Sequence, residues 1–151
     1  MTLPFDPAAV DPEEFGEKQA TLEMDHQQAI EYVRAVCTDA GFGVPVEFSP
    51  SEMLNKKIDA DRDPYYVLGA CNPVVADRAL DATDKRLGAL MPCNMIVWQE
   101  EPGLQRVYHV SIMKIARLLG MAADTDEMDA IIDDTGEMVA AVFDELDASD
   151  A

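Results

Sequence analysis

The sequence predicts one α+β domain, in which helices cover a mixed β-sheet in the order β-α-β-α-β-α-β-β-α-α. Helix start signals and short apolar runs alternate along a chain of 151 residues, a length that suits one domain. Apolar sheet faces and apolar helix stripes must both be covered, and packing one on the other gives a two-layer fold. We expect an extended N-terminal arm at 1–16, the domain at 17–147 and a disordered tail at 148–151.

Capping and turn residues set the limits of the elements in the first half of the chain. Asp25 and Gln28 have the spacing of a capping box, and Gly41 lies where a helix commonly ends. Ser49 and Pro50 form a second start signal, with the serine as cap and the proline in the first helical position. These signals predict strands at 19–24 and 44–48 and helices at 25–40 and 50–58.

Similar signals continue through the second half. Asn72 and Pro73 start a helix, and a Glu-Glu-Pro-Gly turn at 100–103 joins two apolar runs into a hairpin. Gly120 ends a short helix, and Asp124 is the expected cap of the last one. We predict strands at 65–70, 93–100 and 105–111 and helices at 73–81, 112–119 and 124–147. The last helix keeps one apolar face, which is either core or the seam of a dimer.

The acidic composition excludes several classes of partner. Thirty Asp and Glu residues oppose 11 Lys and Arg residues, and the formal net charge is −19. Nucleic acids and anionic membranes need a basic surface, so neither is an expected partner. Because such a charge repels itself and salt screens that repulsion, we expect a halophilic, cytoplasmic protein with an acidic surface. The alternative is a mesophilic protein that binds its partner through an acidic face.

Short motifs in the middle of the chain resemble one known family. They lie mostly within 42–111 and read AGFGV (40–44), YVLGACNP (66–73), AL (79–80) and LGALMPCN (87–94). Together they resemble the uncharacterised family called domain of unknown function 302, and the acidic surface makes this member look haloarchaeal. The resemblance implies a small α/β sandwich-like fold and a homodimer, but no reaction. The arm at 1–16 is an addition, and Met113 and Lys114 stand where such proteins usually carry an acid.

The two Cys-Asn turns form the candidate site. Cys71 and Asn72 precede a predicted helix, whereas Cys93 and Asn94 follow Pro92. An odd number of cysteines and the absence of CxxC argue against a disulfide framework. The first hypothesis is a non-enzymatic binding or interaction module with its site near these turns, and we predict no catalytic residue. The second is a thiol-dependent redox, sulfur-carrier or soft-metal protein that uses Cys71, whose thiolate a helix start would favour.

Three questions about this site stay open at the level of sequence. Cys71 and Cys93 lie together only if their strands are antiparallel, and the connecting helix is long enough for the parallel arrangement. His109 joins the side of Cys93 in only one of two strand registers. No cofactor is predicted, although Cys, His and Met ligands would suit a soft metal such as copper, and the methionines near Cys93 and His109 in the sequence are Met91, Met95 and Met113.

The remaining candidates have structural explanations. Cys37 lies on an apolar helix face and is expected to be an inert core thiol. His26 is expected to be solvated. Aromatic side chains could line an apolar small-molecule pocket between the sheet and the helices, or could simply be core; they are Tyr65, Tyr66, Trp98 and Tyr108.

Overall fold

A computed structural model describes residues 2–148 of the chain, which form an α+β fold around a five-stranded sheet. The strand order is β1-β5-β4-β3-β2, and every neighbouring pair is antiparallel. The mixed sheet of the sequence prediction is therefore wrong, although the order of helices and strands is as predicted. The strands are β1 (Lys18–Leu22), β2 (Gly43–Phe48), β3 (Tyr65–Cys71), β4 (Cys93–Glu101) and β5 (Leu104–His109).

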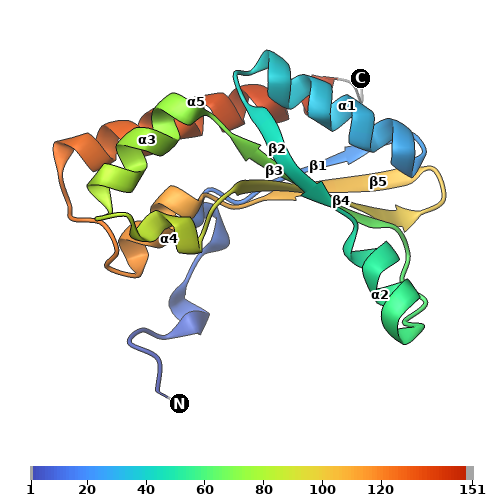
Figure 1. Ribbon diagram of the computed structural model, residues 1–151, viewed down its shortest axis with the longest axis horizontal. Coiled ribbons are helices and arrows are strands. Elements are labelled where there is room, and N and C mark those ends of the chain that lie inside the picture. The colour runs from blue at the N-terminus through green and yellow to red at the C-terminus, as the bar shows by residue number, and fades with distance from the viewer. Residues whose placement is uncertain (1, 149–151) are drawn as a thin grey trace.

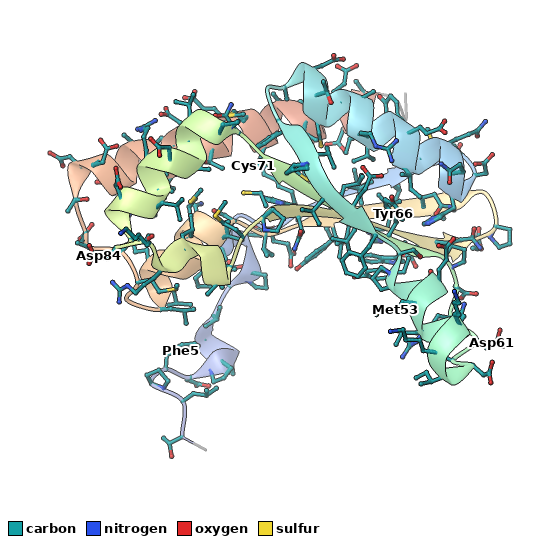
Figure 2. The ribbon with its side chains drawn as sticks, viewed as in Figure 1. Phe5, Met53, Asp61, Tyr66, Cys71 and Asp84 are labelled. Atoms are coloured by element: carbon teal, nitrogen blue, oxygen red, sulfur yellow. The ribbon has the colours of Figure 1, made fainter. Side chains whose placement is uncertain are left out.

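The helices are distributed unevenly about the sheet (Figure 1). The long helices α1 and α5 lie across one face, with α3 beside α5. Helix α2 and the N-terminal arm project from the opposite side, at separate ends of the sheet. Figure 2 shows Phe5 of the arm and Met53 of α2 on that side. The helices are α1 (His26–Asp39), α2 (Pro50–Ile58), α3 (Pro73–Ala82), α4 (Ile112–Leu118) and α5 (Asp126–Ala148).

Two apolar clusters form the core. The larger one lies between α1, α5 and the sheet and includes the fully buried Leu22 and Leu68. The smaller one joins α3, α4 and α5 around Leu87 and Met128. Met138 of α5 packs against both clusters. The apolar stripe of α5 is thus core of this chain and is not left over as a dimer seam, although the homodimer itself stays a prediction.

The other face of the sheet is not covered by a helix layer. Val46 and Phe48 of β2 are 56% and 48% exposed there. Strand register places Tyr65, Trp98 and Tyr108 on this same face, where Trp98 lies 6.0 Å from each tyrosine ring, centroid to centroid. Tyr65 and Trp98 line an open pocket of about 550 Å³ between this face and Pro50, Ser51 and Leu54 of α2, so the expected aromatic pocket is confirmed for these two rings. Tyr108 does not line it, and Tyr66 instead faces α1.

Local capping explains why most helix limits agree with the prediction. The Asp25–Gln28 capping box is complete, and Ser49 accepts from the backbone N–H of Glu52 at the start of α2. The last helix differs, because Thr125 rather than Asp124 caps it by accepting from the N–H of Met128 at 3.2 Å. Asp124 instead lies 3.8 Å from the guanidinium of Arg117.

The ends of the chain also differ in part from expectation. The N-terminal arm contains two 3₁₀ turns, Pro7–Ala9 and Pro12–Phe15, so it is not extended throughout. It is attached to the domain where the N–H of Ser111 donates to the carbonyl of Phe15 at 2.8 Å. Of the predicted tail, Ala148 is helical, and 149–151 lie outside the described residues. Within 2–148, no helix has the length and apolar character that crossing a membrane requires.

Candidate functional site

Cys71 and Cys93 lie at the same end of two neighbouring antiparallel strands. Ala70 of β3 is the direct partner of Cys93 of β4, so Cys71 is one residue beyond that pair. The chain leaves β3, forms α3 and a 3₁₀ turn at Arg86–Ala89, and returns to the same end of the sheet. This path places the two Cys-Asn turns together, which settles the question of strand direction that the sequence left open.

Asn72 fixes the turn after Cys71. Its side-chain oxygen accepts from the N–H of Val75 at 3.0 Å and caps α3, while Pro73 occupies the first helical turn. Its side-chain nitrogen donates to the carbonyl of Gly41 at 3.0 Å. One amide thus joins the start of α3 to the end of α1, and it holds the backbone of Cys71 beside both.

Replacing Asn72 with alanine is expected to destabilise the protein by about 2 kcal/mol, because a helix cap and a second hydrogen bond are each worth about 1 kcal/mol. Asn72→Asp keeps the acceptor that caps α3 but loses the donor to Gly41, so it should cost about half as much. Urea denaturation of the three proteins measures both differences. Equal stability of Asn72→Ala and the unchanged protein would show that the turn does not depend on this amide.

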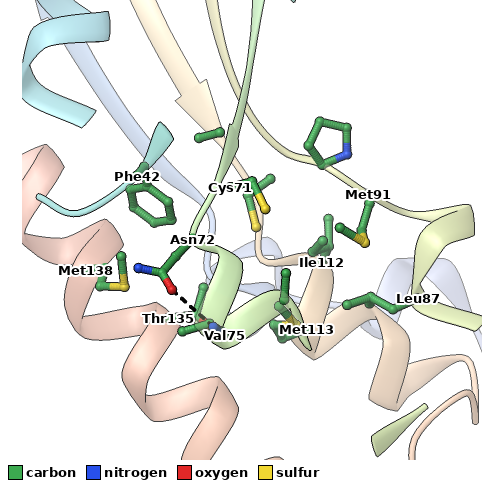
Figure 3. A pocket seen from close by; sticks show the side chains of 14 residues that line it. Phe42, Cys71, Asn72, Val75, Leu87, Met91, Ile112, Met113, Thr135 and Met138 are labelled. Atoms are coloured by element: carbon green, nitrogen blue, oxygen red, sulfur yellow. Dashed lines mark hydrogen bonds between the residues drawn. The ribbon is translucent and has the colours of Figure 1, made fainter. Parts of the chain in front are cut away.

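The two thiols open onto a narrow cleft (Figure 3). Cys71 is half-buried and Cys93 is 7% exposed. The cavity volume is about 20 Å³, which is room for the centre of about one water molecule. Three thioethers from separate parts of the chain share the lining with the thiols, and they belong to Met91, Met113 and Met138.

Burial makes two of the three thiols hard to ionise. Desolvation raises the pKa of Cys93 to about 12, with a further increase from the neighbouring Cys71. Desolvation likewise raises the pKa of Cys37 to about 11, and this side chain is fully buried on the core-facing side of α1. The structure thus gives Cys37 the surroundings expected of an inert core thiol.

His109 lies on the same face of the sheet as Cys93, as one of the two possible registers required. It is 2% exposed, and its Nδ1 is 2.9 Å from the carbonyl oxygen of Asn94. Burial lowers its pKa, so the ring is neutral at pH 7. The side chain of Asn94 is exposed and does not line the cleft, so only the backbone of this residue contributes to the site.

The second histidine differs from expectation. Nδ1 of His26 lies 2.8 Å from the side-chain oxygen of Gln105, which is itself fully buried, so His26 is not simply solvated. It sits apart from the cleft, at the start of α1. Its sequence neighbours, a capping box, gave no sign of a contact 79 positions away.

Sequence reasoning found the two thiols but not most of their neighbours. Of the methionines that the sequence suggested, Met91 and Met113 line the cleft, whereas Met95 and His109 do not. Met138 of α5 reaches the cleft through tertiary packing, and no local motif connects it to Cys71. Among the described residues, no group of three or more His, Cys, Asp or Glu side chains is placed to hold a metal ion. Any metal held here would therefore need the thioethers.

These features define a small α+β protein with a sulfur-lined cleft at one end of an antiparallel sheet. Residues 18–146 match the family model DUF302, domain of unknown function, and the chain belongs to that family. A crystal structure of an uncharacterized conserved DUF302 protein from Bacillus stearothermophilus has the same fold. The TM-score is 0.73 at 24% identity, over 86% of this chain and 97% of that one. No curated protein shows a match to this chain.

Proposed function

We propose that this chain is a non-enzymatic binding protein and that its sulfur-lined cleft holds one Cu(I) ion. The observation that carries the proposal is that five sulfur side chains, from β3, β4, α4, α5 and the loop before β4, line one cleft. Thiolate and thioether ligands select Cu(I) among the common metal ions. Zn²⁺ is a poorer fit, because structural zinc sites use four Cys, His or carboxylate ligands.

The size of the cleft favours an ion over an organic substrate. A volume of about 20 Å³ admits one atom-sized ligand, and a substrate of several atoms would have to displace Met91, Met113 or Ile112. The two strand ends and the cap at Asn72 hold the thiols in place. The cleft thus has the dimensions of a metal site more than those of an active site.

The chemistry of the lining supports binding over catalysis. The two thiols are the only ionisable side chains that line the cleft within residues 2–148, since neither a carboxylate, an imidazole nor a basic group does so. General acid–base catalysis requires such a group within hydrogen-bond distance of the reacting atoms. Coordination requires only that the thiols lose their protons to the metal.

The test is anaerobic titration of the reduced protein with Cu(I) in the presence of a chromophoric competitor. We expect one ion per chain, and at least a hundredfold weaker binding for Cys71→Ser and for Cys93→Ser. Met113→Leu should weaken binding by about tenfold, whereas Met53→Leu, at an exposed position of α2, should not change it. Raising the pH from 6 to 8 should strengthen binding, because Cys93 has a raised pKa and must release a proton.

Two results would contradict the proposal. One is a competitor that keeps all the copper, and the other is Cys71→Ser protein that binds as tightly as the unchanged chain. The thiol-redox and sulfur-carrier alternative is favoured by the partial exposure of Cys71 beside Cys93. Formation of a reversible Cys71–Cys93 disulfide in the metal-free protein, detected by alkylation and mass mapping, would support this alternative.

A further inference from the structure

A second, larger cavity lies on the other side of Cys93. Its volume is about 210 Å³, and it is enclosed by the start of β1, the end of β5, the start of α4 and the middle of α5. Cys93, Ile112 and Thr135 belong to the walls of both cavities, and Figure 3 labels the last two beside the sulfur cleft. The cavity is ten times the size of the cleft and has a different lining.

The charge of this lining is opposite to that of the chain as a whole. Lys18 and Lys114 line the cavity, and no Asp or Glu does, in a protein whose acids outnumber its bases by 30 to 11. Neither lysine forms an ion pair with any residue in 2–148, whereas Arg34, Arg78, Arg106 and Arg117 all do so. Two unpaired cations beside one cavity form a local positive field in an acidic protein.

A buried imidazole adds a polar group to the interior. The Nδ1 of His109 points to the carbonyl oxygen of Asn94, so this nitrogen carries the proton of the neutral ring. The other ring nitrogen, Nε2, has no hydrogen-bond partner among residues 2–148. Among the described residues, Nε2 is not one of the fully buried unpaired atoms, so a ligand hydroxyl or a water can reach it and donate to its lone pair.

The remaining walls are apolar and limit the size of a ligand. Ile132, Val139 and Ala140 line the side formed by α5. A cavity of 150 Å³ with apolar walls holds a benzene molecule, so about 210 Å³ suits a ligand of roughly six to ten non-hydrogen atoms. Inorganic phosphate would leave the apolar walls without contacts.

From this combination, the geometry points to a binding site for a short-chain organic carboxylate. Lys18 and Lys114 bind the carboxylate, the α5 wall covers the hydrocarbon part, and His109 provides the polar group at depth. This site goes beyond copper binding and does not depend on it. The two cavities share a wall, but a carboxylate in the larger one needs neither thiol as a ligand.

The experiment is titration calorimetry at a constant 1 M ionic strength, with butyrate as the probe. Butyrate should bind with a dissociation constant in the millimolar range or below and more tightly than inorganic phosphate. Butylammonium has the same hydrocarbon part and the opposite charge, and it should not bind. Butyrate should also shift the ¹⁵N resonance of His109 Nε2, which a non-specific salt effect would not do.

Matched double variants locate the site. Lys18→Gln/Lys114→Gln should raise the dissociation constant for butyrate at least tenfold. Lys56→Gln/Lys57→Gln removes the same charge from exposed positions on α2 and should leave it unchanged. Circular dichroism checks that both variants fold. Cys71→Ser should keep butyrate binding while losing copper, so that failure of one proposal is distinguishable from failure of the other.

Four outcomes would overturn the carboxylate site. The first is the absence of heat with butyrate at tens of millimolar. The second is an equal response to butyrate and butylammonium, and the third is an equal loss of affinity in the two double variants. Binding of phosphate without butyrate would also overturn it, because the site would then accept inorganic anions only.

Discussion

Raising KCl from 0.1 M to 2 M is expected to raise the melting temperature by about 10 °C or more. The net charge of −19 repels itself in the compact state, and 2 M salt shortens the range of that repulsion to under about 3 Å. For a chain of this length, 1 kcal/mol corresponds to about 2–4 °C, so the expected shift is roughly 3–5 kcal/mol. Differential scanning calorimetry at a series of KCl concentrations measures it.

Part of this stabilisation by salt should arise within helix α5. It carries nine acidic residues and no basic one, and Asp144, Glu145 and Asp147 lie in its last turns. Negative charge at a helix C-terminus opposes the helix dipole, by about 0.3–1 kcal/mol for each group at low salt. Salt screens this repulsion as well as the repulsion between the acids.

Two triple variants separate the effect of negative charge at the C-terminus of α5 from the effect of the overall charge. Asp144→Asn/Glu145→Gln/Asp147→Asn should stabilise the protein at 0.1 M KCl and reduce its dependence on salt. Glu23→Gln/Asp63→Asn/Glu101→Gln makes the same charge change at three exposed positions outside the helices and should have a smaller effect. A melting temperature that is unchanged or lower in 2 M KCl would reject the halophilic hypothesis.

The helix and strand limits could be predicted because their signals are local. Asp25, Ser49 and Asn72 each cap a helix with their own side chains, and the residues that follow them provide the N–H groups. Strand pairing is not local in this sense. From the sequence alone, a connection through α3 could lead to a parallel or an antiparallel β4. In the structure the 3₁₀ turn at Arg86–Ala89 returns the chain to the end of the sheet where β3 stops, so the two strands are antiparallel.

The candidate site likewise contains residues that local motifs predict and residues that only tertiary packing brings in. Cys71 and Cys93 stand in recognisable motifs, so their position at element ends followed from the sequence. Neither Met138 nor Lys18 is near them in the chain, and packing of α5 and β1 brings these side chains to the two cavities. The small number of lysines was the available signal for the larger cavity, since a lysine without an acidic partner is unexpected in so acidic a chain and indicates a possible anion site.

Replacing Gly69 with alanine is expected to destabilise the protein by about 3 kcal/mol. A Cβ atom at this position would lie 2.6 Å from the ring of Pro92 and 2.8 Å from the carbonyl oxygen of Val46. Gly69 pairs with Val46 of β2 on one side and Asn94 of β4 on the other, so β3 cannot move away without breaking ladder hydrogen bonds. Overpacking of this kind usually costs about 1–3 kcal/mol, and the backbone contact places this site at the upper end.

Gly88 provides the matched control for that substitution. Nothing lies within 4 Å of a Cβ atom built there, so Gly88→Ala should change stability by no more than about 0.5 kcal/mol. Urea denaturation compares the two variants, and copper titration of folded Gly69→Ala shows whether displacing Pro92 also disturbs the cleft that this proline lines. If both variants are equally stable, Pro92 yields without cost, and the glycine of the LGAC motif is not needed for close packing against it.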